Sequence, residues 1–286
     1  MSRVVPRPID DVRPLRIAHL YPSLLNVAGD GGNLRAIERR CSWRGIRTET
    51  VAISLNDVPD FEDFDLIMFH GGQDIEMRVV ANDLQKKAAA LREAADAGVT
   101  IFAVCAGLQL LGHRYIPAGE PVMEGAGVLD LETRGTSQRF MQHAACIVSF
   151  DDGSEEVVGF ENHSGQTVLG PAVEPFGRVL AGAGNNGSDG TEGARRDNVF
   201  ATYLHGPVLP KNPGLTDRLI RIALRRQIDG PVHLASLDDT VERTNHEVAL
   251  EKALRNRGRR TILAAAQLGR IGMDRRSSPK PASVGR

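Results

Sequence analysis

Short, mostly apolar runs are the feature that most constrains the fold of this chain. They recur at Leu15–Leu20, Val51–Ile53, Leu66–Phe69 and Ile101–Val104. Apolar residues that are continuous rather than alternating are typical of strands covered on both faces. We therefore expect these runs to form neighbouring parallel strands inside one buried sheet.

A helical pattern separates the last two of these runs. Within the segment 78–97, apolar residues recur at helical spacing and Gly98 ends the pattern. The sequence therefore predicts one helix over this segment and a β-helix-β unit around it. Repeated units of this kind form an α/β fold with a doubly wound, mostly parallel sheet of the flavodoxin-like type, whose ligands bind beyond the carboxyl ends of the strands.

The pattern changes from Gly127 to about Leu180. Short β-rich runs, such as Val128–Leu131 and Cys146–Phe150, alternate with Gly, Asp and Asn. This predicts an added antiparallel β layer. We interpret Gly182–Gly193 as a surface turn, after which the buried run Val199–Leu204 returns the chain to the main sheet.

A change of composition near residue 230 suggests two parts. An amphipathic helix marked by Leu215 and Leu219 is followed by Gly230-Pro231, which breaks the pattern. We predict a main domain over 14–230 and a C-terminal helical extension over 231–286. Residues 251–286 hold ten Lys or Arg against two Asp or Glu. We expect the end of this basic tail to be disordered and assign it no role, although such a tail could contact an anionic partner or a membrane surface.

Composition narrows the class of protein. The chain has 35 Lys and Arg against 36 Asp and Glu, which argues against a general nucleic-acid binder. Its three cysteines do not suggest a disulfide framework, and we interpret Cys41 and Cys146 as structural. No apolar segment reaches the roughly 18 residues of a membrane span, and no signal-peptide core follows Met1. We therefore expect a cytoplasmic protein.

Cys105 is the main candidate nucleophile. The apolar run before it leads straight into a predicted short helix that begins at Ala106. A thiol at a helix N-terminus is stabilised as the reactive thiolate, and the N–H of the next residue is placed to bind an oxyanion. A lone cysteine at a strand end is more often a small buried hydrophobe, so other residues must support this assignment.

Two other strand ends supply that support. His70-Gly71-Gly72 follows the strand Leu66–Phe69, and paired glycines allow a tight turn in which Gly72 would be the second oxyanion donor. His205 ends a later buried run, and imidazole can take a thiol proton near neutral pH. A thiol, a glycine loop and an imidazole at one sheet edge predict acyl transfer through a covalent intermediate.

These residues resemble the class I glutamine amidotransferases. Their nucleophile turn reads roughly G-x-C-x-G-x-Q, matched here by Cys105, Gly107 and Gln109, with Ala103 in place of the first glycine. Over about residues 15–227 the chain is most similar to the cobyric-acid-synthase type, and within it to the GatD family of glutaminase subunits of lipid II isoglutaminyl synthase. The more specific matching segments are Phe69–Asp74, Gly125–Asp130, Gly159–Gly165, Gly184–Asn186 and Thr202–Asn212.

This resemblance implies a function. The chain would hydrolyse L-glutamine to glutamate and ammonia through a Cys105 thioester. The ammonia would pass to a MurT-like Mur ligase in a heterodimer, which amidates D-glutamate of the lipid II stem peptide in peptidoglycan biosynthesis. No P-loop motif occurs in the sequence. We therefore expect no cofactor in this chain, and ATP and Mg²⁺ on the partner ligase.

The chain departs from the wider class after the histidine. That class carries a glutamate two residues beyond it, where this chain has Pro207. We therefore predict a dyad of Cys105 and His205. The resemblance implies that the MurT-like partner would supply the missing acid, so that activity would depend on assembly.

The remaining predictions concern the pocket. Arg139 matches the family's glutamine-binding arginine, and a guanidinium suits an α-carboxylate; Arg134 is the alternative if the register is shifted. Gln109, Asn162 and His163 are expected to shape the pocket. We disfavour a second acid-base pair of Glu161 with His163. We also disfavour a metal site of His143 with His163, since the closely spaced ligands of a zinc site are missing. The run containing Glu161 more simply fixes a loop.

Three rival functions stay open at this point. The ammonia could serve another amidation, such as that of cobyrinic acid. The chain could be a non-catalytic regulatory subunit that keeps the fold, or Cys105 could be a redox-active cysteine.

Overall fold

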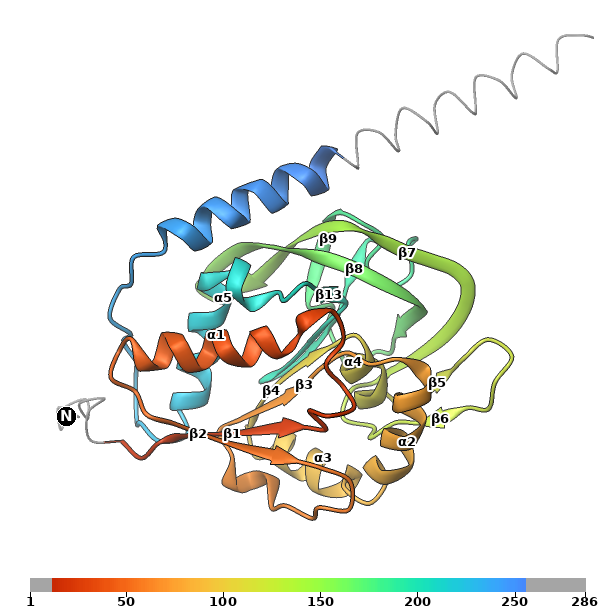
Figure 1. Cartoon of the computed structure of the whole chain (residues 1–286), viewed down its shortest axis with the longest axis horizontal. Helices are drawn as coiled ribbons and strands as arrows, with labels where there is room; N and C mark the ends of the chain where they lie inside the picture. Colours follow the sequence, from red (N-terminus) through yellow and green to blue (C-terminus); the bar gives the residue numbers. More distant parts are fainter. Residues whose placement is uncertain (1–11, 256–286) are drawn as a thin grey trace, which may run out of the picture.

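The computed structural model describes residues 12–255, and the predictions for 256–286 lie outside them. A central sheet of six strands has the order β11-β12-β4-β3-β1-β2 (Figure 1). All its pairs are parallel except that of β11 with β12. This confirms the predicted mostly parallel sheet. Its strands are β1 (Leu15–Leu20), β2 (Thr48–Ile53), β3 (Leu66–Phe69), β4 (Thr100–Val104), β11 (Ala194–Arg196) and β12 (Val199–Thr202).

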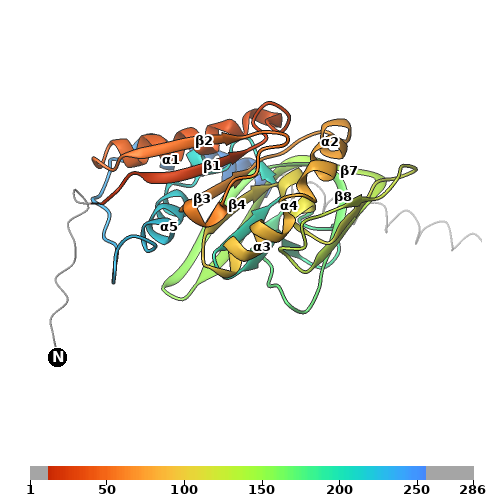
Figure 2. The same ribbon diagram turned by 90° about the horizontal axis from the view of Figure 1, so that it is seen from below.

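Helices cover both faces of this sheet. Every residue of β3, β4 and β12 is buried, as expected of central strands in a doubly wound sheet. Helices α1 (Gly31–Ser42) and α5 (Pro213–Leu224) contact each other on one face. Figure 2 shows α3 (Ala88–Asp96) on the opposite face, together with α2 (Asp74–Leu84). Short 3-10 turns occur at Val27–Gly29, Phe61–Asp63 and Leu209–Lys211.

The prediction of one helix over 78–97 is wrong. Helix α2 ends at Leu84, and α3 begins at Ala88. Between them the chain turns, so that Lys87 becomes buried and its ammonium bonds the carboxylate of Asp83. A buried charge needs such a partner. The apolar spacing continues through the turn and therefore hides it.

A second sheet is dominated by a long antiparallel hairpin of β7 (Leu131–Phe150) and β8 (Gly153–Leu169). This confirms the added antiparallel layer, in which only β5 and β7 pair in parallel among the described strands. Its other strands are β5 (Arg114–Ile116), β6 (Met123–Glu124), β9 (Gly177–Ala181), β10 (Thr191–Glu192) and β13 (Leu204–His205).

Two local predictions in this region are wrong. Of the run 128–131, only Leu131 belongs to a strand, as the first residue of β7. Residues 128–130 form a bend, because the N–H groups of Val128 and Leu129 both donate to the carbonyl of Leu111 in α4 (Ala106–Leu111). The segment 182–193 is only partly a surface turn. Asn185 is fully buried there, and its side-chain amide donates to the carbonyl of Gly193 at 2.8 Å.

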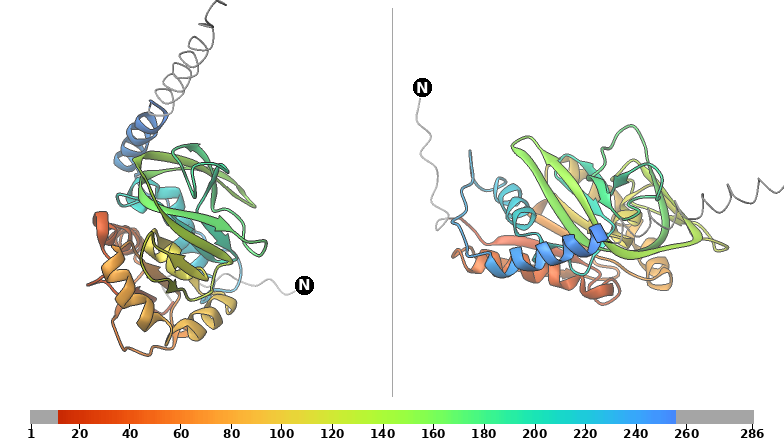
Figure 3. Two further views of the ribbon diagram at one scale, coloured as in Figure 1. Left: turned by 90° about the vertical axis from the view of Figure 1, so that its right-hand side faces the viewer. Right: turned by 90° about the horizontal axis from the view of Figure 1, so that it is seen from above.

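Residues 240–255 form a further helix, which runs along the α1 side of the molecule in the right-hand view of Figure 3. It buries Ala249 and Ala253 against Ala145 and Val158. None of the helices within residues 12–255 combines the length and the apolar character needed to cross a membrane. The boundary near residue 230 stays a prediction.

Candidate active site

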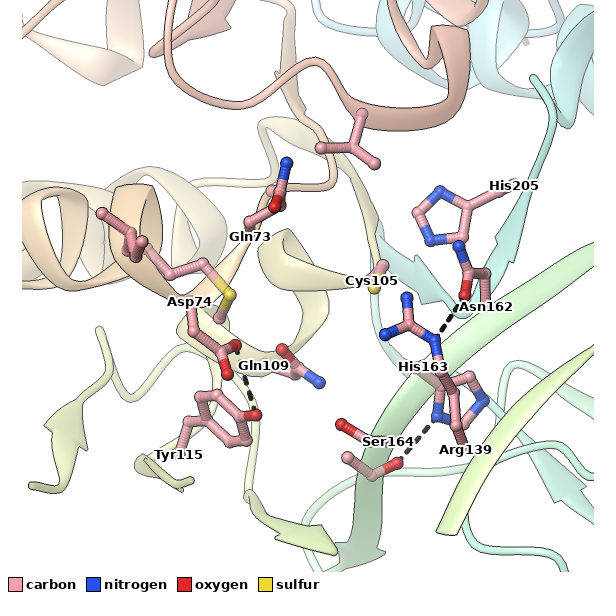
Figure 4. Close-up of a pocket in the computed structure, with 15 residues that line it drawn as sticks. Gln73, Asp74, Cys105, Gln109, Tyr115, Arg139, Asn162, His163, Ser164 and His205 are labelled. Carbon is pink, nitrogen blue, oxygen red and sulfur yellow. Dashed lines mark hydrogen bonds between the residues drawn. The ribbon is translucent and has the colours of Figure 1, made fainter. Parts of the chain in front are cut away.

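Neighbouring strands of the central sheet deliver the candidate residues to one edge. Cys105 follows β4, Gly71 and Gly72 follow β3, and His205 lies just beyond β12. Cys105, Gly72 and His205 line a cavity of about 450 Å³. Figure 4 shows Cys105 between the two walls that carry Asp74 and His205. The edge is the one where a doubly wound sheet binds ligands.

Cys105 sits in a strained turn between β4 and α4. Its backbone has φ 50° and ψ −99°, a conformation that costs a non-glycine residue about 1–3 kcal/mol. The turn is held by the N–H of Cys105, which donates to the carbonyl of Thr202 at 2.8 Å. Gly107 permits the close approach of α4 to β3, because an added Cβ would lie 2.2 Å from the carbonyl oxygen of Phe69. The predicted strand-turn-helix is thus present, with the thiol at the cavity.

His205 is buried beside Cys105 and its protonated form is stabilised there. Burial by itself would lower the imidazole pKa. The negative charge of the Cys105 thiolate and the hydrogen bond to Asp30 outweigh burial, so the pKa of His205 is raised. An imidazolium next to a thiolate is the charged form of a cysteine-histidine pair.

The expectation that His205 lacks a carboxylate partner in this chain is wrong. Oδ2 of Asp30 lies 2.9 Å from Nδ1 of His205, and Asp30 is fully buried. Asp30 precedes α1 as its N-cap residue, yet its side chain makes no capping hydrogen bond. The sequence contained one usable signal, an aspartate beside paired glycines after the strand next to β3. The contact spans 175 residues and could not be read from local spacing.

The two expected oxyanion donors flank Cys105. Gly72 lines the cavity, and its Cα packs so tightly that an added Cβ would lie 2.2 Å from Cδ2 of Leu25. Ala106 is the buried first residue of α4, directly after Cys105. Their roles as donors stay predictions.

The structure separates the two candidate arginines. Arg139 lines the cavity, and its Nε donates to Oδ1 of Asn162 at 2.9 Å. Arg134 lies beside Glu132 and lines a different cavity. The geometry thus favours Arg139 over Arg134 as the group that meets a ligand beside Cys105.

The other pocket residues are held in fixed positions. Gln109 lines the cavity and donates to the hydroxyl of Tyr203 at 3.2 Å. His163 also lines it, with its ring stacked on Tyr203 at 3.7 Å between centroids. Burial lowers the pKa of His163 to about 4, so that it is neutral near pH 7. A neutral, stacked ring suits a wall better than a second base.

Glu161 and His143 have other roles. The Glu161 carboxylate accepts the N–H groups of Ala183 and Gly184, in agreement with the interpretation that this run fixes a loop. The ring of His143 packs edge-on against Phe160. Across residues 12–255, no group of three or more His, Cys, Asp or Glu is placed to hold a metal ion.

The other two cysteines are buried in the core. Cys41 lies in α1 and Cys146 in β7, and burial raises the pKa of both thiols. Neither lines the cavity that Cys105 borders. This agrees with the interpretation that they are structural.

Comparison with known proteins places this arrangement in a family. The model of the CobB/CobQ-like glutamine amidotransferase domain matches residues 16–213, which is more than half of the chain. The chain belongs to this family. The matched region contains Asp30, Cys105, Arg139 and His205.

Curated relatives extend the match. The chain is 35% identical over 238 residues to the lipid II isoglutaminyl synthase subunit GatD of Streptococcus pneumoniae, covering 83% of this chain and 90% of that one. It is 34% identical to GatD of Staphylococcus aureus, covering 85% and 98%. A probable cobyric acid synthase of Methanothermobacter thermautotrophicus is 32% identical, with 55% of this chain and 33% of that protein covered.

Proposed function

We propose that this glutamine amidotransferase is the glutaminase subunit of a cytoplasmic lipid II isoglutaminyl synthase. It would release ammonia from L-glutamine and deliver it to a MurT-like, ATP- and Mg²⁺-dependent ligase that amidates D-glutamate of the lipid II stem peptide. The observation that carries the proposal is the strained Cys105 turn, with a buried His205 beside it and Arg139 on the same cavity. The similarity to the GatD subunits over most of both chains supports the choice of acceptor.

The residues suit a thioester mechanism. The Cys105 thiolate attacks the side-chain amide carbon of glutamine, while the N–H groups of Ala106 and Gly72 bind the oxyanion. As the C–N bond breaks, His205 gives its proton to the leaving nitrogen and ammonia departs. Water then attacks the thioester as His205 takes its proton, which releases glutamate and restores the thiolate.

Arg139 would select the amino acid. Its guanidinium is a charged partner for the α-carboxylate of glutamine. Asn162 holds the guanidinium at Nε, which leaves its terminal nitrogens for a ligand. A free α-carboxylate would thus be required, and glutamine within a peptide would be rejected.

The test is ammonia and glutamate release from L-glutamine by this chain, alone and with its MurT-like partner. Cys105→Ala should lower the rate by at least about 10⁴-fold, because the nucleophile is lost. With the partner, ATP and a lipid II substrate, ammonia should appear as an amide on D-glutamate. A chain that hydrolyses no glutamine in either state would instead be a binding subunit.

The proposed binding of the glutamine α-carboxylate by Arg139 is tested with matched arginine variants. Arg139→Gln should raise KM for glutamine about 10- to 100-fold, since a hydrogen bond to a charged group contributes about 1.5–3 kcal/mol. Arg134→Gln should leave KM unchanged. The reverse pattern would show that the register assignment is wrong.

A further inference from the structure

The cavity beside Cys105 carries opposite charges on opposite walls. Among the described residues that line it, Arg139 is the only Lys or Arg, and Asp74 is the only Asp or Glu. Figure 4 shows the Arg139 guanidinium on the wall of His205, pointing into the cavity, and the Asp74 carboxylate on the other wall. A ligand that lies across this cavity therefore meets a cation on one side and an anion on the other.

Asp74 has no charged partner of its own. Within residues 12–255 it forms no salt bridge, and its carboxylate accepts one hydrogen bond, from the hydroxyl of Tyr115 at 3.4 Å. Asp74 is also the first residue of α2, where a negative charge stabilises the helix N-terminus. That role does not require the carboxylate to line a cavity, so helix stability does not explain its position.

Tyr115 keeps one oxygen of this carboxylate occupied and leaves the other for a ligand. Burial and the negative charges of Asp74 and Cys105 raise the pKa of Tyr115, so its hydroxyl keeps the proton that it donates. The hydroxyl bonds Oδ1 of Asp74, and Oδ2 has no partner among the described residues. The wall therefore presents an unpaired anionic oxygen close to the thiol.

We propose that Asp74 binds the α-ammonium group of L-glutamine and, with Arg139, selects a free α-amino acid. This inference deepens the proposed function and rests on it for the identity of the ligand. The α-ammonium and the α-carboxylate are attached to the same carbon, so a zwitterion between Asp74 and Arg139 pairs both of its charges. Its side chain then leaves that carbon toward Cys105. Three fixed contacts define the hand of the α-carbon, so D-glutamine would be a poor ligand.

The test compares substrates that each lack one charged group. Glutaramate is glutamine without its α-amino group, and 4-aminobutanamide is glutamine without its α-carboxylate. Asp74→Asn should lower kcat/KM about 10-fold for L-glutamine and for 4-aminobutanamide, mainly through KM. It should change kcat/KM for glutaramate less than about twofold, because glutaramate has no ammonium group to lose. Where an analogue is not hydrolysed, its inhibition constant against L-glutamine gives the same comparison.

A matched variant controls for the helix end. Glu76 also lies in the first turn of α2 but does not line the cavity. Glu76→Gln removes the same charge and should leave kcat/KM for L-glutamine within about twofold of wild type. If Asp74→Asn weakens L-glutamine and glutaramate equally, or if Glu76→Gln has the same effect, the proposal is overturned. Asp74→Ser, which also suits a helix N-terminus, replaces Asp74→Asn if circular dichroism shows that the latter is unfolded.

Binding without turnover separates this proposal from the proposed function. The Kd for L-glutamine is measured by calorimetry on Cys105→Ala, alone and with the MurT-like partner. Adding Asp74→Asn should raise this Kd about 10-fold. If wild type hydrolyses no glutamine but this difference is seen, the proposed function fails while the role of Asp74 stands. Equal Kd values, or no binding of L-glutamine in either state, would overturn the role of Asp74.

Discussion

Asp30 and Glu192 are two buried carboxylates that accept hydrogen bonds from the same short segment, residues 202–205. Asp30 accepts from the imidazole of His205, whereas Glu192 accepts from the hydroxyl of Thr202 and the N–H of Tyr203. Burial raises the pKa of Glu192 to about 7, because these neutral donors only partly offset desolvation. The comparison shows that the group a buried carboxylate faces decides its role: Asp30 can shape the chemistry of a base, while Glu192 closes a backbone turn.

The largest loss of activity is expected from Gly71→Ala, which disturbs the contact between Asp30 and His205. The added Cβ would lie 2.7 Å from Cε1 of His205 and 2.8 Å from Oδ2 of Asp30, so the two groups would have to move apart. We expect kcat/KM for glutamine to fall at least about 100-fold, as it does when catalytic groups are displaced by about 1 Å.

A matched glycine variant controls for backbone strain. Gly153 is the first residue of β8, directly after the turn from β7; it has φ 138°, and a Cβ added there would meet nothing within 4 Å. Gly153→Ala is therefore the control. It should lose stability but keep its rate. Near-normal turnover by Gly71→Ala would mean that the contact between Asp30 and His205 is not needed.

A smaller effect is expected from Gly32→Ala. Alanine favours a helix over glycine by about 0.5–1 kcal/mol, so α1 itself should gain stability. The new methyl group would press on Pro207 and shift α1 away from the histidine loop. We expect a loss of about 10-fold in kcat/KM, or about 1.4 kcal/mol.

The double variant isolates that contact. Pro207→Ala removes the ring that meets the new methyl group, so Gly32→Ala with Pro207→Ala should be more active than Gly32→Ala alone. Strictly additive losses would show that the two residues do not act through each other.

These residues also mark how far the sequence alone could lead. The central strands were predictable because burial on both faces leaves continuous apolar runs, and Cys105 and His205 followed from the ends of such runs. Asp30 could not be predicted in this way, because its contact with His205 depends on the packing of α1 against Pro207. The break between α2 and α3 was hidden for a similar reason, since Lys87 turns inward to a partner that its apolar spacing does not reveal.

The smallest effect on activity is expected from Glu192→Gln, which should instead change stability. A glutamate whose folded pKa is raised to about 7 binds its proton more tightly when folded, so the free energy of unfolding falls as pH rises from about 4.5 to about 7. Above that range the loss in free energy of unfolding approaches about 3 kcal/mol.

Glutamine at position 192 carries no charge, but its amide places donors where Oε2 has no partner among the described residues, at a cost of about 1 kcal/mol in the free energy of unfolding. The variant should therefore be more stable than wild type by about 2 kcal/mol at pH 8 and no more stable at pH 5, as measured by urea unfolding. Glu174→Gln, at an exposed position, should match wild type at both pH values. Turnover by Glu192→Gln should stay within about threefold of wild type, since Glu192 bonds the hydroxyl of Thr202 and the N–H of Tyr203 and not the imidazole. A loss of activity comparable to that expected for Gly71→Ala would mean that both carboxylates serve His205.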